Sequence, residues 1–240
     1  MRIYRICVLG CLLWTGCFTE AYAQVKEDSL FNISVTAFRS IYFDEIKSNA
    51  QLYHGRKYAV EKKIAEGFPY FGADVLKAGT LSYQGIVYSP INLHYDLVND
   101  QVISTSYFHD DLVVLYPEMV DSFSIGPHIF INFAKVNGLP EKGFYERLLA
   151  GEPGLFARRE KKFRYGTGHQ ESRYVEKNNY FILIRDNFYP VDSKTEMLNL
   201  FRDQSEVLNK FIRTHKIRFK EDFESALLRC VIYYSGLKHS

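Results

Sequence analysis

Three side chains able to transfer protons lie near one another in the middle of the chain: His94, Asp96 and Asp100. Residues 91–97 have an apolar residue at every odd position, which is typical of a β-strand with one buried face. On such a strand His94 and Asp96 emerge on the same face, about 7 Å apart. An imidazole beside carboxylates could serve as a general acid and base or bind a metal, with Asp100 in the following loop as a third member.

These polar residues also have a simpler explanation. A strand of an antiparallel sheet with one face in water carries polar side chains at alternate positions, whatever its function. On this reading Asn92, His94 and Asp96 line the solvated face beside Ser104 and Ser106 of the next strand. The sequence alone leaves both explanations open, and the second needs no chemistry.

Motifs of the common enzyme and cofactor sites are missing from the sequence. The seven histidines show no H-E-x-x-H or other metal-ligand spacing. There is no G-x-S-x-G, no phosphate-binding glycine loop and no G-x-G-x-x-G. The sequence therefore predicts no metal and no cofactor. It favours a non-catalytic protein without deciding the matter, because paired carboxylates leave no regular signature.

One basic cluster with interleaved aromatic residues spans residues 158–165. Its cations are Arg158, Arg159, Lys161, Lys162 and Arg164. They could form a patch for an anionic ligand, such as an envelope polymer or a lipid headgroup. The alternative is a solvent-exposed β-hairpin, because Lys and Arg are ordinary residues of exposed strands.

The first 23 residues have the pattern of a secretory signal peptide. Arg2 and Arg5 precede an apolar run over residues 6–14, and Ala21-Tyr22-Ala23 supplies the small residues that a signal peptidase accepts. We expect cleavage after Ala23 and an exported protein, periplasmic or secreted. A membrane span needs roughly 20 predominantly apolar residues, and this run is interrupted by Thr15, Gly16, Thr19 and Glu20, so we do not expect an uncleaved membrane anchor. No transmembrane segment is expected after cleavage.

Cysteine usage and net charge bear on membrane attachment, on disulfide bonds and on the class of partner. Cys17 follows Trp14-Thr15-Gly16, and lipidation of this cysteine is the alternative to a soluble exported protein. Beyond the signal only Cys230 remains, so we expect no intramolecular disulfide and a small residue in the core. The formal net charge of the chain is +2, which is too near neutral to indicate a nucleic-acid partner.

A period of two dominates residues 79–192 and predicts a sheet. Consecutive strands without helical crossovers make that sheet antiparallel. For the strand over residues 91–97, a three-residue loop would pair Tyr95 with Ile103 and keep one face apolar. The strands expected after this hairpin cover residues 112–115, 120–125, 128–133, 155–159, 162–165, 173–176, 180–185 and 188–191, with a turn at Lys177-Asn178-Asn179.

Helices are expected both before and after the sheet in the sequence. Residues 24–78 are expected to be partly helical and partly irregular chain leading into the sheet, with loose helical spacing of apolar residues between residues 29 and 53. The segment over residues 193–240 opens with the capping box Ser193-Lys194-Thr195-Glu196. Asp203 could cap a second helix there, and residues 220–234 supply a third. We therefore predict an α+β fold: a mostly antiparallel β meander, curved or half-barrel, within a single domain over residues 24–240.

Several phrases resemble a group of uncharacterised exported proteins of Bacteroidota-type bacteria. The run Asn49-Ala50-Gln51-Leu52-Tyr53-His54-Gly55-Arg56-Lys57-Tyr58 is similar to their "N-x-x-L-Y-N-G-x-x-Y" opening, with His54 in place of Asn. Gly67-Phe68-Pro69-Tyr70-Phe71 and Tyr95-Asp96-Leu97 are similar as well. The resemblance implies a bacterial envelope protein and transfers no catalytic residue.

These observations favour a non-catalytic exported or envelope protein that binds a partner protein, a lipid or another apolar ligand. The chain contains 18 Tyr and 19 Phe, some of which could line a concave ligand surface while most form the core. The alternative is an exported hydrolase that uses His94 with carboxylates as acid–base residues.

Overall fold

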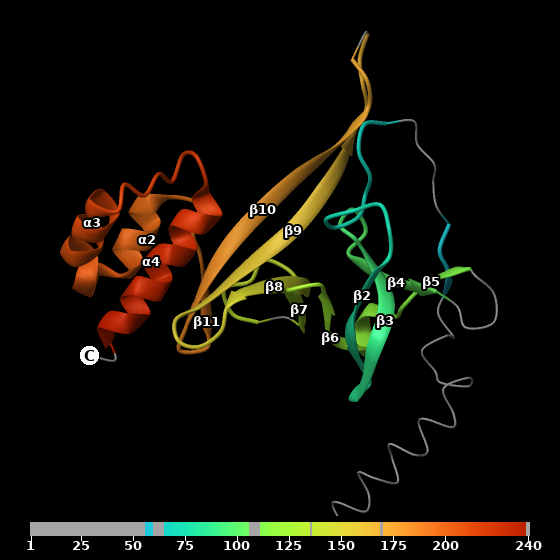
Figure 1. The fold of residues 1–240 in the computed structure, drawn as a ribbon, viewed down its shortest axis with the longest axis horizontal. Coiled ribbons are helices and arrows are strands. Elements are labelled where there is room, and N and C mark those ends of the chain that lie inside the picture. The colour runs from blue at the N-terminus through green and yellow to red at the C-terminus, as the bar shows by residue number, and fades with distance from the viewer. Residues whose placement is uncertain (1–55, 60–64, 106–110, 135, 169, 239–240) are drawn as a thin grey trace, which may run out of the picture. The chain divides into compact units, whose positions relative to one another are not determined.

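The structure, a computed structural model, describes residues 56–59, 65–105, 111–134, 136–168 and 170–238. All of them belong to one unit, Gln51–Ser240. The predicted signal peptide, Cys17 and the helices expected between residues 29 and 53 lie outside the described residues. Within them, the fold is α+β as predicted, with one large antiparallel sheet that is not closed and helices at the C-terminal end (Figure 1).

Eleven strands of the described chain form the sheet, in the spatial order β1-β5-β4-β3-β2-β6-β7-β8-β9-β10-β11. Their bounds are β1 Arg56–Lys57, β2 Lys77–Tyr83, β3 Ile86–Asp96, β4 Gln101–Thr105, β5 Leu112–Val114, β6 Val120–Ile125, β7 His128–Phe133, β8 Gly143–Leu149, β9 Gly154–Arg164, β10 Arg173–Ile184 and β11 Asn187–Pro190. The sheet is thus two runs of hairpins, joined where β2 pairs with β6. At this junction a Cβ on Gly79 would lie 1.8 Å from the carbonyl oxygen of Ser124, so only glycine lets the two strands approach.

The β3–β4 hairpin has a different register from the predicted one. Tyr95 pairs with Val102 and His94 with Ile103, across a turn formed by residues 97–100. The prediction assumed one apolar and one solvated face, but His94 and Tyr95 are both buried. Alternation does not fix the register of a strand that is covered on both faces.

This register also moves the predicted polar face. Ser104 pairs with Leu93, so it lies on the opposite face of the sheet from His94. Its hydroxyl donates a hydrogen bond to the carbonyl oxygen of Asn92 at 3.0 Å. Ser106, expected beside it, is outside the described residues. The row of polar side chains expected along this hairpin therefore does not form.

Two predicted strand breaks are also absent. The turn expected at residues 177–179 lies inside β10, which pairs continuously with β9 from Arg173 to Leu183. The two strands expected at residues 155–159 and 162–165 are likewise the single strand β9. Opposite charges face each other across this ribbon, Lys177 to Glu160 and Glu176 to Lys161, which favours a paired strand over a turn.

The predicted strand bounds are confirmed for β6 and β7, whereas β8 was not predicted. Phe144, Tyr145 and Glu146 of β8 are all buried. A strand buried on both faces does not alternate between apolar and polar residues, so the period-two signal that marks β6 and β7 is missing from β8.

The described C-terminal helices are α2 (Lys194–Leu200), α3 (Ser205–Thr214) and α4 (Phe223–Lys238), and 3-10 turns lie at η2 (Pro117–Met119) and η3 (Arg202–Gln204). The predicted capping box is confirmed: Ser193 Oγ accepts the backbone N–H of Glu196 at 3.2 Å. Asp203 does not cap α3, contrary to the prediction, because its carboxylate instead accepts the hydroxyl of Tyr234 at 3.1 Å. No helix of the described chain has the length and apolar character needed to cross a membrane.

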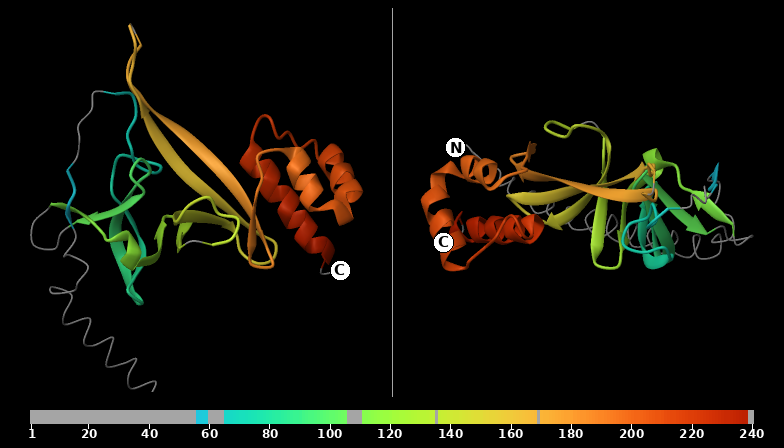
Figure 2. Two further views of the ribbon diagram at one scale, coloured as in Figure 1. Left: turned by 180° about the vertical axis from the view of Figure 1, so that it is seen from behind. Right: turned by 90° about the horizontal axis from the view of Figure 1, so that it is seen from above.

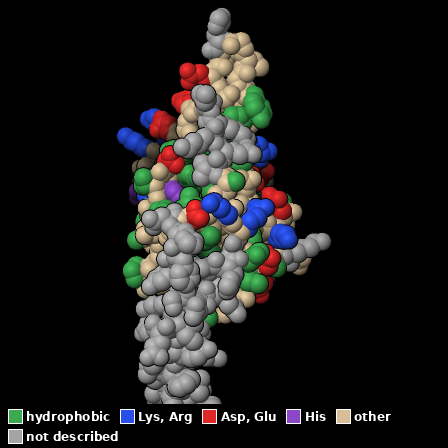
Figure 3. All heavy atoms as spheres, turned by 90° about the vertical axis from the view of Figure 1, so that its right-hand side faces the viewer, with side chains coloured by type: hydrophobic (Ala, Val, Ile, Leu, Met, Phe, Trp, Pro, Cys, Tyr) green, Lys and Arg blue, Asp and Glu red, His purple; other side chains and the backbone are tan. Residues whose placement is uncertain are grey.

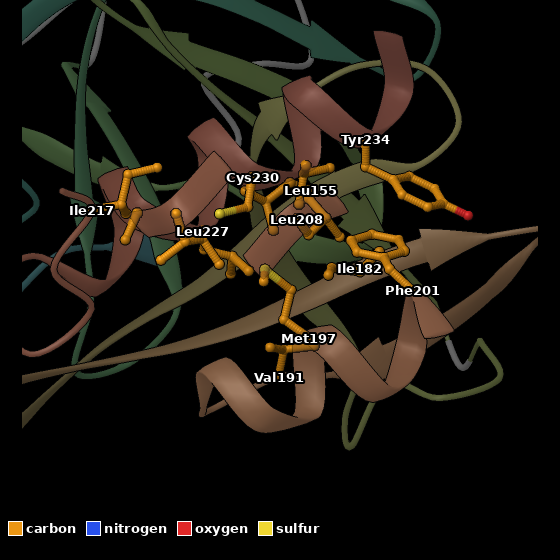
Figure 4. Packing of buried hydrophobic residues seen from close by; sticks show 13 residues of the cluster. Leu155, Ile182, Val191, Met197, Phe201, Leu208, Ile217, Leu227, Cys230 and Tyr234 are labelled. Carbon is orange, nitrogen blue, oxygen red and sulfur yellow. The ribbon is translucent and has the colours of Figure 1, made fainter. Parts of the chain in front are cut away.

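The helices cover one end of the sheet, at β9 to β11 (Figures 1 and 2). Leu155 of β9 and Ile182 of β10 pack there against Met197, Leu227 and Cys230, as Figure 4 shows. Cys230 is fully buried, as predicted, and burial raises the pKa of its thiol to about 11. A thiol in this state is an inert packing residue rather than a nucleophile.

A second core consists of stacked and edge-to-face aromatic rings on β3, β6, β7 and β8. Tyr95 contacts Phe123, Phe130 and Phe144 with ring centroids 5.0–5.8 Å apart. Much of the aromatic content noted in the sequence is therefore core, as expected. β3 packs in this core, and β3 and the turn after it contain the predicted site residues His94, Asp96 and Asp100.

Candidate functional site

The three predicted acid–base residues do not come together. His94 and Asp96 share one face of β3, as predicted, but neither faces open solvent, since they are 7% and 0% exposed. His94 stacks on the ring of Tyr70 with centroids 4.1 Å apart. Burial lowers the pKa of its imidazole below the ordinary 6.5, against a smaller opposing effect of Asp74. A neutral, stacked imidazole of this kind is a packing residue.

Asp96 anchors the β3–β4 turn. One carboxylate oxygen accepts the backbone N–H groups of Val98 and Asn99, at 2.8 and 3.1 Å. The other accepts the side-chain amide of Asn99 at 2.8 Å and the hydroxyl of Tyr58 at 2.9 Å. With four hydrogen bonds to its two oxygens, the carboxylate holds the turn in place and orients Tyr58.

Asp100 contacts the opposite side of the hairpin. It accepts the hydroxyl of Tyr95 at 2.6 Å and the Nη2 of Arg158 at 2.9 Å. Burial, with a contribution from Asp100, raises the pKa of Tyr95, so its phenol stays protonated and donates. Since Tyr95 alternates with His94 and Asp96 along β3, Asp100 cannot act together with them on one ligand.

A cleft of about 720 Å³ lies beside Asp96. Aromatic residues from three distant parts of the chain line it: Tyr58, Phe68, Tyr70, Phe163 and Tyr174. Its polar lining includes Arg56, Lys57, Asp74, Asp96, Asn99 and Gln101. Aromatic walls with a few fixed polar groups are the usual composition of small-molecule sites.

Several contacts fix the aromatic wall of this cleft. Lys161 donates to the carbonyl oxygens of Phe68 and Tyr70, at 3.1 and 2.7 Å, and its ammonium lies 4.5 Å from the centre of the Phe68 ring. The rings of Tyr58 and Tyr70 are 6.3 Å apart. Burial raises the pKa of both phenols, so both hydroxyls remain protonated at neutral pH.

The predicted basic cluster is divided between the two faces of β9. Arg158 and Arg159 are only 5% and 7% exposed. Arg158 pairs with Asp100, and Lys161 is held by the two carbonyl oxygens in the cleft wall. Lys162 and Arg164 are the two members of the cluster that remain exposed. The five cations therefore do not form one surface patch.

A buried charge network that the sequence analysis missed runs from β7 to α4. Glu146 is 2% exposed; one of its oxygens lies 2.5 Å from Nδ1 of His128, and the other accepts Nε of Arg159 at 2.6 Å. Arg159 also pairs with Glu224 of α4 at 2.6 Å, and Tyr180 donates to the same Glu224 oxygen at 3.0 Å. The sequence signal was a glutamate among the large apolar residues Phe144, Tyr145, Leu148 and Leu149.

This network fixes His128 at the protein surface. The side chain is 44% exposed, and within the described residues only Nδ1 makes a hydrogen bond. Among those residues no group of three or more His, Cys, Asp or Glu could hold a metal ion. Figure 3 shows one face of the molecule, where basic side chains gather near the middle with acidic ones beside them. That face carries mixed charge rather than one sign.

Comparisons of the chain with protein-family models, curated proteins and solved structures give no match.

Proposed function

We propose that this protein is a non-catalytic, exported binding protein whose ligand occupies the cleft beside Asp96. The observation that carries the proposal is the convergence of Tyr58, Tyr70, Phe163 and Tyr174 around one cleft. These residues come from distant segments of the chain, so the cleft is a product of the tertiary fold. The expected signal peptide supports export.

The lining favours a ligand with both apolar faces and hydrogen-bonding groups. The aromatic rings offer flat apolar surfaces. The carboxylate of Asp96 already accepts four hydrogen bonds, so the polar groups left for a ligand are those of Arg56, Lys57, Asp74, Asn99 and Gln101. A wholly apolar ligand would leave these groups without partners, which costs binding free energy. A small amphipathic molecule fits the lining better than a lipid tail.

A probe that is both aromatic and anionic tests the cleft. Val98 lines it and is 39% exposed, so Val98→Trp fills the cleft without disturbing the core. The matched control is Val87→Trp on β3, at a residue that is 66% exposed and outside the cleft lining. We expect 1-anilinonaphthalene-8-sulfonate to bind the wild type and Val87→Trp alike and Val98→Trp about tenfold more weakly. Equal binding by all three proteins would remove the cleft as the ligand site.

A second candidate function, a hydrolase, rests on His128 and not on His94. Glu146 fixes Nδ1 of His128 and leaves Nε2 toward solvent, the arrangement of a general base. In ester hydrolysis, Nε2 would take a proton from water as its oxygen attacks the acyl carbon, and the same proton would pass to the leaving alcohol oxygen. His128 does not line the cleft, which is why binding is the function proposed first.

The two candidates differ in which histidine matters. Hydrolysis of p-nitrophenyl acetate, followed by absorbance, should be the same for wild type, His128→Gln and His94→Gln if the protein only binds. A loss of rate in His128→Gln alone, with unfolding midpoints unchanged, would support the hydrolase and contradict the non-catalytic proposal. A loss confined to His94→Gln would contradict both assignments.

A further inference from the structure

The outer half of the β9–β10 hairpin is a two-stranded ribbon. β8 leaves β9 after Ala157, and β11 pairs with β10 only from Phe181 onward. Between these points β9 and β10 pair with each other up to the Arg164–Arg173 pair, and the only other β-bridge that they form among the described residues is a parallel one between Arg173 and Glu66. Figure 1 shows this end of the ribbon running away from the helices.

The two faces of this ribbon differ in chemistry. Directly opposite residues of an antiparallel pair share a face. One face carries Phe163 and Tyr174, which line the cleft, and Lys161, which is tied to the neighbouring segment. The other face carries the exposed basic residues Lys162, Arg164, Arg173 and Lys177. We refer to these four residues as the basic face.

Glu66 forms a backbone bridge to Arg173, but neither it nor any other described carboxylate forms an ion pair with the basic face. Glu160 lies opposite Lys177 in the register, but its carboxylate is 3.9 Å from Arg158. Glu171 in the connecting loop is exposed, and Glu176 lies on the other face. The four cations of the basic face are therefore left without an ion-pair partner among the described residues.

Arg164 and Arg173 lie directly opposite each other. Like charges in this position destabilise a sheet, so the pair has no stabilising role in the isolated protein. An arginine side chain presents a planar fork that binds phosphate oxygens in pairs. The opposed arginines thus fit a phosphate group better than they fit each other.

The spacing of the four cations indicates an extended ligand. Residues two apart on a strand are about 7 Å apart, so Arg173 and Lys177 are separated by about 13 Å. A single phosphate ion cannot reach both ends of this row. The one apolar residue among the basic positions, Val175, is half-buried, so the face offers no group to enter a lipid bilayer.

From these observations we infer that the basic face binds a linear polyanion whose phosphate groups lie along the β9–β10 ribbon. This site is on the opposite side of the ribbon from Phe163 and Tyr174, and so is separate from the cleft. It retains Lys162 and Arg164 of the predicted anionic-ligand cluster and adds Arg173 and Lys177, which only the strand pairing brings beside them.

The test uses fluorescently labelled inorganic polyphosphate and the whole protein, with binding followed by anisotropy at several salt concentrations. Arg164→Gln/Arg173→Gln removes the opposed pair. The matched control, Arg202→Gln/Arg213→Gln, removes the same charge from exposed positions on η3 and α3. We expect the first variant to bind about tenfold more weakly, with a shallower salt dependence. The control should bind like the wild type.

Thermal unfolding separates binding from folding in this experiment. Because the two arginines repel each other, Arg164→Gln/Arg173→Gln should unfold at the same temperature as the wild type or higher. Equal losses in the two variants would show an effect of net charge alone and overturn the proposal. Binding to vesicles of anionic phospholipid without binding to polyphosphate would also overturn it, in favour of a membrane surface.

Discussion

Glu146 of β8 and Arg159 of β9 form a buried ion pair, in which Nε and Nη2 of the guanidinium both lie 2.6 Å from one carboxylate oxygen. Arg159 also forms an ion pair with Glu224 of α4, so the network links the sheet to the C-terminal helices. Burial alone would lower the pKa of Arg159, but the two carboxylates raise it instead. The guanidinium therefore stays charged and depends on both partners.

Replacing Glu146 should be strongly destabilising. Glu146→Gln leaves a buried guanidinium short of one carboxylate, and we expect it to lower the free energy of unfolding by about 3 kcal/mol. Urea unfolding followed by tyrosine fluorescence measures this change. Glu141→Gln, at an exposed residue without an ion pair, is the control and should cost less than about 0.5 kcal/mol. Equal effects of the two substitutions would show that the network does not hold the helices.

Gly79 should tolerate no side chain. Alanine there would place its Cβ 1.8 Å from the carbonyl oxygen of Ser124 and force β2 away from β6. We expect Gly79→Ala to cost about 3 kcal/mol, the upper range for overpacking. Gly85→Ala is the comparison: its Cβ meets nothing within 4 Å, and only its positive φ of 74° is unfavourable, at about 1 kcal/mol. If the two variants unfold at the same urea concentration, the β2–β6 junction is wrong.

The stability of helix α2 should depend on its N-cap, Ser193. Ser193→Ala removes the hydrogen bond to the N–H of Glu196 and should cost about 1 kcal/mol. Ser205→Ala is matched in chemistry, but Ser205 begins α3 without a side-chain cap, so its loss should be close to neutral. Calorimetric unfolding measures the stability lost in each variant. A larger loss of stability for Ser205→Ala than for Ser193→Ala would contradict the observed capping.

His94 should make the protein less stable at acidic pH. Its pKa is lower in the folded protein than the ordinary 6.5, because burial disfavours the charged ring. The unfolded chain therefore binds the proton first. The stabilisation from neutral His94 is complete above about pH 6.5 and is lost as the pH falls toward the folded pKa.

His94→Phe, which keeps a ring against Tyr70, isolates this effect. The stability of wild type minus that of the variant, from urea unfolding at pH 7.5 and 5.5, should decrease on acidification. A difference that stays constant or increases would show that His94 is accessible to protons in the folded state.

The sequence reveals those parts of the fold in which one side of an element is in water. The capping box at Ser193 is local, and β6 and β7 alternate clearly, so both could be predicted. The β3–β4 register could not, because His94 and Asp96 are buried on a face that was expected to be solvated, and β8 could not, because Glu146 is buried among its apolar residues. What covers the His94 face is Tyr70, more than twenty residues away in the sequence, and alternation carries no information about such a contact.

The candidate sites show the same limit. Asp96 stands out in the sequence, yet its function is to hold a turn, as its four hydrogen bonds show. The aromatic cleft joins Tyr58, Tyr70 and Tyr174, and no spacing rule connects residues so far apart. The opposed pair Arg164–Arg173 likewise becomes visible only once the register of β9 and β10 is known.

The most direct test of the proposed binding function is native mass spectrometry of the whole protein, purified without denaturation from the cells that produce it. The wild type and Val87→Trp should carry one non-covalently bound small molecule, which is released on unfolding, and Val98→Trp should be free of it. A bound molecule of the same mass in Val98→Trp, or unliganded spectra for all three proteins, would contradict the account.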